Sequence, residues 1–407
     1  MVNYITNNDT IIFSPIFNKP LDPKVLSKYK KIIFSDYKLE YYLFEAYENS
    51  NFENLFFGRS KFNQLLNSSL NNLRSLTYLT FGECFNRVLG NSLDNLRSLT
   101  HLTFGYQFNQ QLNNSLNNLR SLTHLTFGVN FNRILDNSLD NLKSLTHLTF
   151  GCNFNKPLNN SLDNLRSLTH LTFDHNFNQP LYKSLNNLTS LIHLTFGYSF
   201  NQPLNNSLDN LISLTHLTFG YQFNQLLNNS LDNLRSLTHL TFGYQFNQLL
   251  NNSLDNLRLL THLTFGHNFN QSLNNSLDNL RSLTHIGLGY YYNQKEDLPF
   301  NVKSIRLCCN NSYYIDYLPD SVNEIYFGTY FNLELENLPS SISSIIFDEN
   351  SYYNKELNCL PNNLKILQLP SKYKHPIQNI PFGLKKVICF KDYEFICVFS
   401  NLHVKTF

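Results

Sequence analysis

The stretch from Phe223 to Gln245 reads FNQLLNNSLDNLRSLTHLTFGYQ, and close copies of it fill the middle of the chain. Its Phe-Asn doublet recurs at a constant step of 23 residues from Phe62 to Phe269, and Tyr292-Asn293 continues the phase. Self-similarity at a period of about 20 to 50 residues is typical of solenoids, in which each unit packs mainly against its neighbours. The sequence therefore predicts one repeat solenoid rather than several independent domains.

The first half of each copy carries leucines three residues apart. Leu231, Leu234 and Leu237 have the spacing of a short helical or 3-10 turn, with Ser230 placed to cap it. We therefore expect an α/β-type repeat solenoid that resembles leucine-rich-repeat proteins. Each coil of about 20 to 23 residues should combine one such turn with one short parallel β-strand.

The second half of each copy changes to a period of two. Leu240 and Phe242 alternate with His239, Thr241 and Gly243, as in a strand with one buried face. The Phe of each doublet should form a buried spine, and its Asn should bond the loop backbone of a neighbouring coil. We expect the glycine after each strand to permit a tight turn, and Asp174, which replaces it once, to fit a positive φ.

The ends of the chain depart from the strict repeat. Beyond the Phe-Asn copies, Leu-Pro doublets mark shorter coils, starting with Leu298-Pro299. This change predicts four segments: an N-terminal cap with degenerate coils over 1–61, ten 23-residue repeats over 62–291, shorter Leu-Pro-marked coils over 292–386, and a C-terminal cap over 387–407.

Taken together, the Phe-Asn doublets, the Leu-Pro strings and the Phe-Gly strand ends resemble the FNIP repeat family. This variant of the leucine-rich repeat is known from social amoebae and from giant viruses that infect amoebae. The resemblance covers about residues 17–386 and is clearest from Phe331-Asn332 to Pro339. It implies a protein-binding solenoid and brings no catalytic residues with it.

Several relatives in that family carry an F-box ahead of the repeats, which makes them substrate-recognition adaptors of a ubiquitin ligase. Such a box needs about forty helical residues and usually a Leu-Pro near its start, whereas here no Leu-Pro precedes Pro299. A degenerate box within residues 1–60 stays an alternative. A structural, virion-associated role is a third, with which low charge and high repetitiveness are compatible.

The amino-acid composition indicates which classes of partner the protein binds and in which cellular compartment it resides. Lys and Arg number 31 and Asp and Glu 29, and charged residues are 15% of the chain, where about 25% is usual. This balance disfavours nucleic acid as a partner. No stretch approaches 18 uninterrupted apolar residues, and the seven unevenly spaced cysteines suggest thiols in a reducing compartment. We expect an intracellular protein of the host cytoplasm that binds protein and no membrane.

Nine histidines recur in phase on the predicted outward face of the sheet. We interpret them as a solvated imidazole ladder, with a protein-contact face and a metal site as the alternatives. A zinc site needs ligands that converge on one ion, which a parallel column disfavours. The histidines are His101, His124, His147, His170, His193, His216, His239, His262 and His285.

The residue just after each strand glycine varies between copies, and tyrosine is frequent there. Because tyrosine offers a large contact area at low entropic cost, this column is the best candidate for a protein-contact surface. The residues predicted to carry it are Tyr198, Tyr221 and Tyr244, with His193, His216 and His239 beside them. We found none of the common nucleophile, phosphate-loop or zinc-protease motifs, so the sequence predicts a non-enzymatic scaffold without a cofactor or metal.

Overall fold

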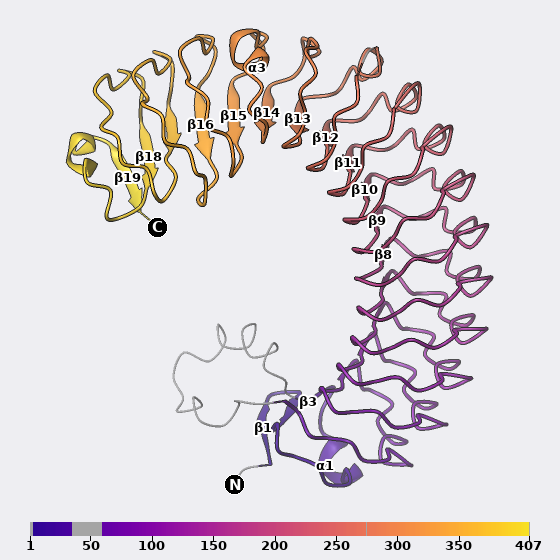
Figure 1. The fold of residues 1–407 in the computed structure, drawn as a ribbon. Coiled ribbons are helices and arrows are strands. Elements are labelled where there is room, and N and C mark those ends of the chain that lie inside the picture. The colour runs from indigo at the N-terminus through magenta and orange to yellow at the C-terminus, as the bar shows by residue number, and fades with distance from the viewer. Residues whose placement is uncertain (1–2, 35–58, 274, 407) are drawn as a thin grey trace. The chain divides into compact units, whose positions relative to one another are not determined.

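The computed structural model describes residues 3–34, 59–273 and 275–406. The chain divides into two compact units, Met1–Leu214 (unit 1) and Thr215–Phe407 (unit 2), and each is a parallel β-solenoid with one short strand per coil (Figure 1). Among the described residues, no helix is long and apolar enough to cross a membrane.

Unit 1 begins with an antiparallel hairpin and continues as a parallel sheet. Strand β1 pairs antiparallel with β2, and from β2 to β9 each strand pairs in parallel with the next. The helix α1 (Pro23–Leu26) lies between β2 and β3. The strands are β1 (Tyr4–Asn7), β2 (Thr10–Phe13), β3 (Lys31–Phe34), β4 (Tyr78–Thr80), β5 (His101–Thr103), β6 (His124–Thr126), β7 (His147–Thr149), β8 (His170–Thr172) and β9 (His193–Thr195).

Unit 2 is a parallel sheet from β10 to β19, and it contains the change from 23-residue coils to shorter ones. The pairing continues across this change, with His285 opposite Ser304. Helix α3 (Tyr313–Asp316) and the 3-10 turn η1 (Ile396–Phe399) lie in two connections. The strands are β10 (His216–Thr218), β11 (His239–Thr241), β12 (His262–Thr264), β13 (His285–Leu288), β14 (Ser304–Leu307), β15 (Glu324–Phe327), β16 (Ser344–Phe347), β17 (Ile366–Gln368), β18 (Lys386–Cys389) and β19 (His403–Thr406).

The core of each coil is built from leucine and phenylalanine, as the pattern predicts. In the coil that starts at Phe131, this ring and Phe150 are 0% exposed. The Phe131 ring stacks on Phe154 of the next coil at 6.1 Å, and Phe150 stacks on Phe154 at 4.1 Å. Burial of such side chains stabilises by about 1.5 to 3 kcal/mol each. The predicted phenylalanine spine is confirmed.

The expected helical or 3-10 turn in each coil is wrong. Among the described residues, helix is confined to α1, α3 and η1. The N–H of Leu234 donates to the Leu231 carbonyl and that of Leu237 to the Leu234 carbonyl, both at 3.0 Å. These bonds close separate turns, whereas a 3-10 helix requires consecutive ones. Successive turns satisfy the three-residue leucine period equally well, because each turn returns a leucine to the core.

Ser230 therefore caps no helix; it is 4% exposed and belongs to a column of buried serines. In the next coil, the Ser253 hydroxyl donates to the Asn228 carbonyl at 2.8 Å. Asn228 itself has a φ of 47°. Left-handed backbone at this position recurs along the chain and suits Asn, Asp and Gly. The residues that adopt it are Asn67, Gly90, Asn113, Asp136, Asn159, Tyr182, Asn205, Asn228 and Asn251.

The glycines after the strands are required for a different reason from the one expected. Among the described glycines, positive φ is recorded at Gly90 and at none of those after the strands, and Asp174 does not have it either. A Cβ built on Gly128 would lie 1.8 Å from the carbonyl oxygen of Gly105 in the preceding coil. The constraint is thus close approach of one backbone to the next, not a left-handed turn.

The asparagine of each doublet forms the predicted ladder. In unit 1, the Asn109 N–H donates to Oδ1 of Asn86, and the Asn132 N–H donates to Oδ1 of Asn109, both at 3.0 Å. In unit 2, the Asn247 N–H donates to Oδ1 of Asn224 at 2.9 Å. The ladder thus satisfies loop amides that would otherwise lack partners.

In the shorter coils of unit 2, tyrosine replaces phenylalanine in the spine. Tyr353 is 2% exposed, and its ring stacks on Phe331 at 6.2 Å and on Tyr373 at 6.2 Å. The Oη atoms of Tyr353 and Tyr373 are buried without a hydrogen-bond partner among the described residues.

The buried hydroxyl of Tyr353 yields a test of the spine. Because an unpartnered buried hydroxyl is destabilising, Tyr353→Phe should raise the free energy of unfolding by about 1 kcal/mol, as measured by urea titration. Tyr292→Phe is the matched comparison, because the Tyr292 hydroxyl donates a hydrogen bond to Glu296 at 3.1 Å. Loss of this bond should lower the free energy of unfolding. Equal effects of the two substitutions would contradict this account of the spine.

The N-terminal segment bears on the F-box alternative. Residues 3–34 contain β1, β2, β3 and the four-residue helix α1, whereas an F-box requires about forty helical residues. Residues 35–58, where the rest of such a box would fall, lie outside the described residues.

Candidate interaction surface

The in-phase histidines open the strands and form one column in each unit. Parallel pairing places equivalent histidines opposite one another, for example His124 opposite His147 and His239 opposite His262. Neighbouring rings stack with centroids 4.1 to 4.4 Å apart in unit 1 and 4.0 to 4.2 Å apart in unit 2. Of the predicted contact residues, His193 stacks on His170 in unit 1, and His216 stacks on His239 in unit 2.

In eight of the nine histidine coils a threonine precedes the strand histidine and contacts its ring, whereas Ile192 precedes His193. The Thr100 hydroxyl donates to the Thr77 carbonyl at 2.9 Å and lies 2.9 Å from Nδ1 of His101. A hydroxyl has one hydrogen to donate, so Nδ1 must be the donor in the second bond. The neutral ring therefore carries its proton on Nδ1 and keeps Nε2 as an acceptor. Thr123 and His124 repeat the arrangement in the next coil.

The columns are partly buried, not fully solvated as expected, and the pKa is lowered at His101, His124, His147 and His262. Burial first, and then the neighbouring histidines, lower the pKa of His124 to about 4. The same causes lower the pKa of His262 to about 4. Stacked parallel rings do not converge on one point, and within the described ranges no group of three His, Cys, Asp or Glu could hold a metal ion. At neutral pH, His124 and His262 are thus uncharged.

The tyrosines predicted to make contacts lie beside these columns, just after the strands. In unit 1, Tyr198 follows β9, is 38% exposed and stacks on His175 with centroids 4.5 Å apart and planes 2° apart. In unit 2, Tyr221 stacks on Tyr244 at 4.4 Å, and Tyr244 stacks on His267 at 4.2 Å.

In unit 2 these rings belong to a longer series. His267 stacks on Tyr290 at 4.8 Å, Tyr290 meets Tyr330 edge to face at 5.2 Å, and Tyr330 stacks on Tyr352 at 5.8 Å. Lys372 Nζ lies 5.9 Å from the Tyr352 centroid, where a cation is attracted to the ring. We call this series the aromatic rim, made of Tyr221, Tyr244, His267, Tyr290, Tyr330 and Tyr352.

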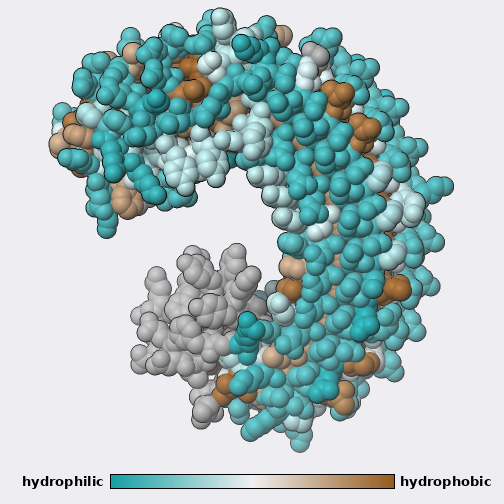
Figure 2. All heavy atoms as spheres, in the orientation of Figure 1, coloured by the Kyte–Doolittle hydropathy of each residue, from teal (hydrophilic) through white to brown (hydrophobic). Residues whose placement is uncertain are grey.

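The aromatic rim is accessible to solvent. Tyr244, Tyr330 and Tyr352 are 36%, 52% and 59% exposed. Burial, and then the neighbouring Tyr221, raise the pKa of Tyr244, so its hydroxyl stays protonated at neutral pH. Along the inner edge of unit 2, Figure 2 shows side chains of intermediate hydropathy gathered between more hydrophilic ones. Such a surface offers ring faces together with hydroxyl donors and acceptors.

Sequence reasoning found the first two rings of the aromatic rim and missed the last three tyrosines. Tyr221 stands directly after Gly220 and two residues before Phe223, whereas Tyr330 stands two residues after Gly328 and directly before Phe331. The shorter coils thus shift the ring by one position. For Tyr330 and Tyr352, the position directly before the spine aromatic was the available signal, whereas Tyr290 continues the column of Tyr221 directly after Gly289.

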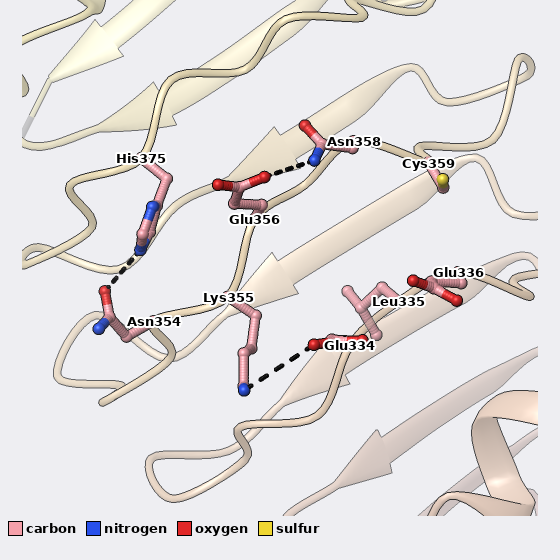
Figure 3. A pocket seen from close by; sticks show the side chains of 9 residues that line it. All are labelled: Glu334, Leu335, Glu336, Asn354, Lys355, Glu356, Asn358, Cys359 and His375. Atoms are coloured by element: carbon pink, nitrogen blue, oxygen red, sulfur yellow. Dashed lines mark hydrogen bonds and ion pairs between the residues drawn. The ribbon is translucent and has the colours of Figure 1, made fainter.

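A polar groove of about 340 Å³ lies beside the short coils of unit 2 (Figure 3). The Glu334 carboxylate lies 3.9 Å from Nζ of Lys355. The Asn358 amide donates to Glu356 at 2.6 Å, and His375 Nε2 lies 2.9 Å from the Asn354 amide oxygen. Several of its polar side chains are thus occupied by one another.

Two family models match the sequence. The BspA type leucine rich repeat region matches in overlapping copies over residues 44–169, 91–210 and 158–284, and the FNIP repeat matches residues 310–350. The FNIP resemblance is thereby confirmed, and no catalytic family is indicated. No curated protein matches the chain.

Solved structures with a similar fold include several repeat proteins. CroV588, a circular leucine-rich-repeat protein, is 29% identical, covers 96% of this chain and 77% of its own, and has a TM-score of 0.47. Internalin inlF of Listeria monocytogenes is 18% identical over 84% of this chain and 87% of its own, with a TM-score of 0.50. A leucine-rich-repeat protein of Leptospira interrogans is 15% identical, over 84% of this chain and 86% of its own, with a TM-score of 0.51. The last two likenesses show the leucine-rich-repeat fold.

Proposed function

Because this chain belongs to the BspA-type leucine-rich-repeat family, whose solenoids commonly act as interaction scaffolds, we propose that it binds another protein through the aromatic rim. The supporting observation is the uninterrupted series of ring contacts from Tyr221 to Tyr352 within unit 2. His216 and His239 open β10 and β11 beside the rim, and Nδ1 of each lies 2.8 to 2.9 Å from the hydroxyl of the preceding threonine. In unit 1, Tyr198 and His193 form a second, smaller candidate contact.

The energetics of the aromatic rim favour binding. Tyrosine is enriched among the few interface residues that supply most of the binding free energy. Stacking between neighbouring rings restricts their rotamers before the partner arrives, which lowers the entropic cost of ordering them. The coils below the rim are held by the Phe spine and the asparagine ladder, so the rings have a fixed spacing. A partner with a flat, partly apolar surface suits this geometry.

We place the interaction in the cytosol of an amoebal host, which the FNIP resemblance and the cysteine pattern support. The adaptor and virion alternatives require further components. An adaptor must carry or recruit ligase subunits, and a virion protein must occur at high copy in purified particles. Both can be read from the same capture experiment.

The binding experiment compares matched variants of the intact protein. We expect Tyr221→Ser/Tyr244→Ser to weaken binding of the partner captured from amoebal cytosol by about tenfold or more, measured by calorimetry with the purified partner. Tyr106→Ser is the control, because Tyr106 is 48% exposed in the same register but lies between Glu83 and Val129. A parallel Tyr198→Ser variant tests the candidate contact of unit 1.

Two results would refute the rim as a contact surface. One is a partner that binds the double variant as tightly as the unaltered protein. The other is a partner lost equally from the Tyr106 control, which would indicate a general effect of removing tyrosine. Ligase subunits in the capture would assign the adaptor role.

A further inference from the structure

Three consecutive coils of unit 1 differ from the other copies of the repeat on the turn side, away from the strands. Pro157, Pro180 and Pro203 occupy the same register, where the other seven 23-residue copies have Leu, Val, Gln, Ile or Ser. Proline fixes its own φ and restricts the residue before it, so these turns are stiffer than their neighbours.

The middle coil of the three carries an unusual residue at its left-handed position. Tyr182 has a φ of 46°, where neighbouring coils have Asn159 and Asn205. A bulky residue is rare in this conformation, and such strain clusters at functional sites. The Tyr182 side chain is also 75% exposed, so the core gains nothing from it. The backbone strain therefore serves to present an aromatic ring to solvent.

A hollow of about 960 Å³ surrounds this ring. Its wall contains the exposed carboxamides of Asn160 in the preceding coil and Asn206 in the following one. The Asn210 amide donates to the Asn186 carbonyl at 3.1 Å, which fixes that part of the wall. All the lining residues are Asn, Ser, Lys, Asp or Tyr, and none is aliphatic.

We propose that this hollow is a binding site for a neutral carbohydrate. The Tyr182 ring offers a flat apolar face for the C–H groups of one pyranose face. Carboxamides on either side present both donors and acceptors, which is what ring hydroxyls require. Lys183 and Asp209 balance one another in charge, so the site does not select an anion. A peptide-binding groove would take the partner's apolar side chains between aliphatic or several aromatic residues, whereas Tyr182 is the one large apolar side chain in this lining.

The test measures binding of the intact protein to β-1,4-linked hexasaccharides of glucose, mannose, xylose and N-acetylglucosamine, by calorimetry and saturation-transfer NMR. We expect a Kd below about 1 mM for at least one of them, weakened about tenfold or more by Tyr182→Asn. Asn is the residue of the neighbouring coils, so this variant should also gain about 1 to 3 °C in Tm as the backbone strain is relieved. Lost binding in a more stable protein excludes misfolding as the cause.

A second pair of variants separates the site from the repeat in general. Asn160→Ala/Asn206→Ala should weaken the same saccharide, whereas Asn114→Ala/Asn137→Ala, at the same register in coils distant from Tyr182, should not. Failure of all four hexasaccharides to bind overturns the proposal. Binding that Tyr182→Asn leaves unchanged, or that both double variants weaken equally, overturns it as well.

Discussion

Replacing Gly128 with Ala is expected to separate two coils of unit 1. The added Cβ would lie 1.8 Å from the Gly105 carbonyl oxygen and 2.9 Å from the Phe104 carbonyl oxygen. Both are backbone atoms held by the ladder between coils, so they cannot move aside as a flexible side chain would. We expect a loss of about 3 kcal/mol in the free energy of unfolding, measured by urea titration. Hydrogen exchange should accelerate in the coils next to Gly128 and stay unchanged in distant ones, because solenoid coils contact mainly their neighbours.

Gly90→Ala is the matched control, because it tests the effect of a left-handed backbone conformation at a glycine that no neighbouring backbone approaches. Gly90 has a φ of 51°, and nothing lies within 4 Å of an added Cβ. Its replacement by Ala should lower the free energy of unfolding by about 1 kcal/mol, and Gly90→Asn should lower it by less, because Asn occupies this position in other coils.

Asp174 marks the coil where a side chain does enter the column of glycines that follow the strands, and the Cys152 thiol donates to its carboxylate at 2.9 Å. Equal losses for Gly128→Ala and Gly90→Ala would contradict the close-approach explanation.

The sequence predicted the parts of the fold that repeat with a clear period. Alternation around Leu240 and Phe242 identified the strands, and the constant 23-residue step aligned Phe and Asn of successive coils. Because parallel stacking places identical positions side by side, the spine and the ladder followed from that alignment. The turns did not follow, since a three-residue leucine spacing is compatible both with a helix and with successive separate turns.

Contacts between coils were the part that sequence alone could not supply. The glycine after the strand looks the same whether it is required by a positive φ or by an adjacent backbone, and only the position of Gly105 against Gly128 decides between them. Tyr330 and Tyr352 of the aromatic rim were missed because the short coils shift the ring by one residue, so neither aligns with Tyr221, whereas Tyr290 keeps the register of Tyr221. Tyr182 gave a sequence signal, as the one bulky residue in a column that otherwise holds Asn, Asp or Gly, but its meaning depends on the φ that the structure reveals.

The histidine columns should make the protein sensitive to mild acid. The pKa of His124 is lowered to about 4 in the folded chain, while an unfolded histidine titrates near 6.5. Between these two pH values the unfolded state binds more protons than the folded state, so stability falls as the pH is lowered. His101 and His147 are shifted in the same direction, again by burial first. Protonation would place like charges about one ring spacing apart along each stack.

We therefore expect the Tm to fall by about 5 to 10 °C between pH 7 and pH 5, a window that lies above the usual titration of carboxyl groups. The triple variant His124→Gln/His147→Gln/His170→Gln keeps a side-chain N–H for the preceding threonine but cannot be protonated, so it should show a smaller fall. Calorimetric scans of both proteins at four pH values in the same ionic strength supply the comparison. A Tm that is equal at pH 7 and pH 5, or a fall of the same size in the triple variant, would show that the stacked histidines do not control the acid response. The Tm falls rather than rises in acid because of the stack itself. Contacts between neutral rings 4.2 Å apart become repulsive once neighbouring rings are charged.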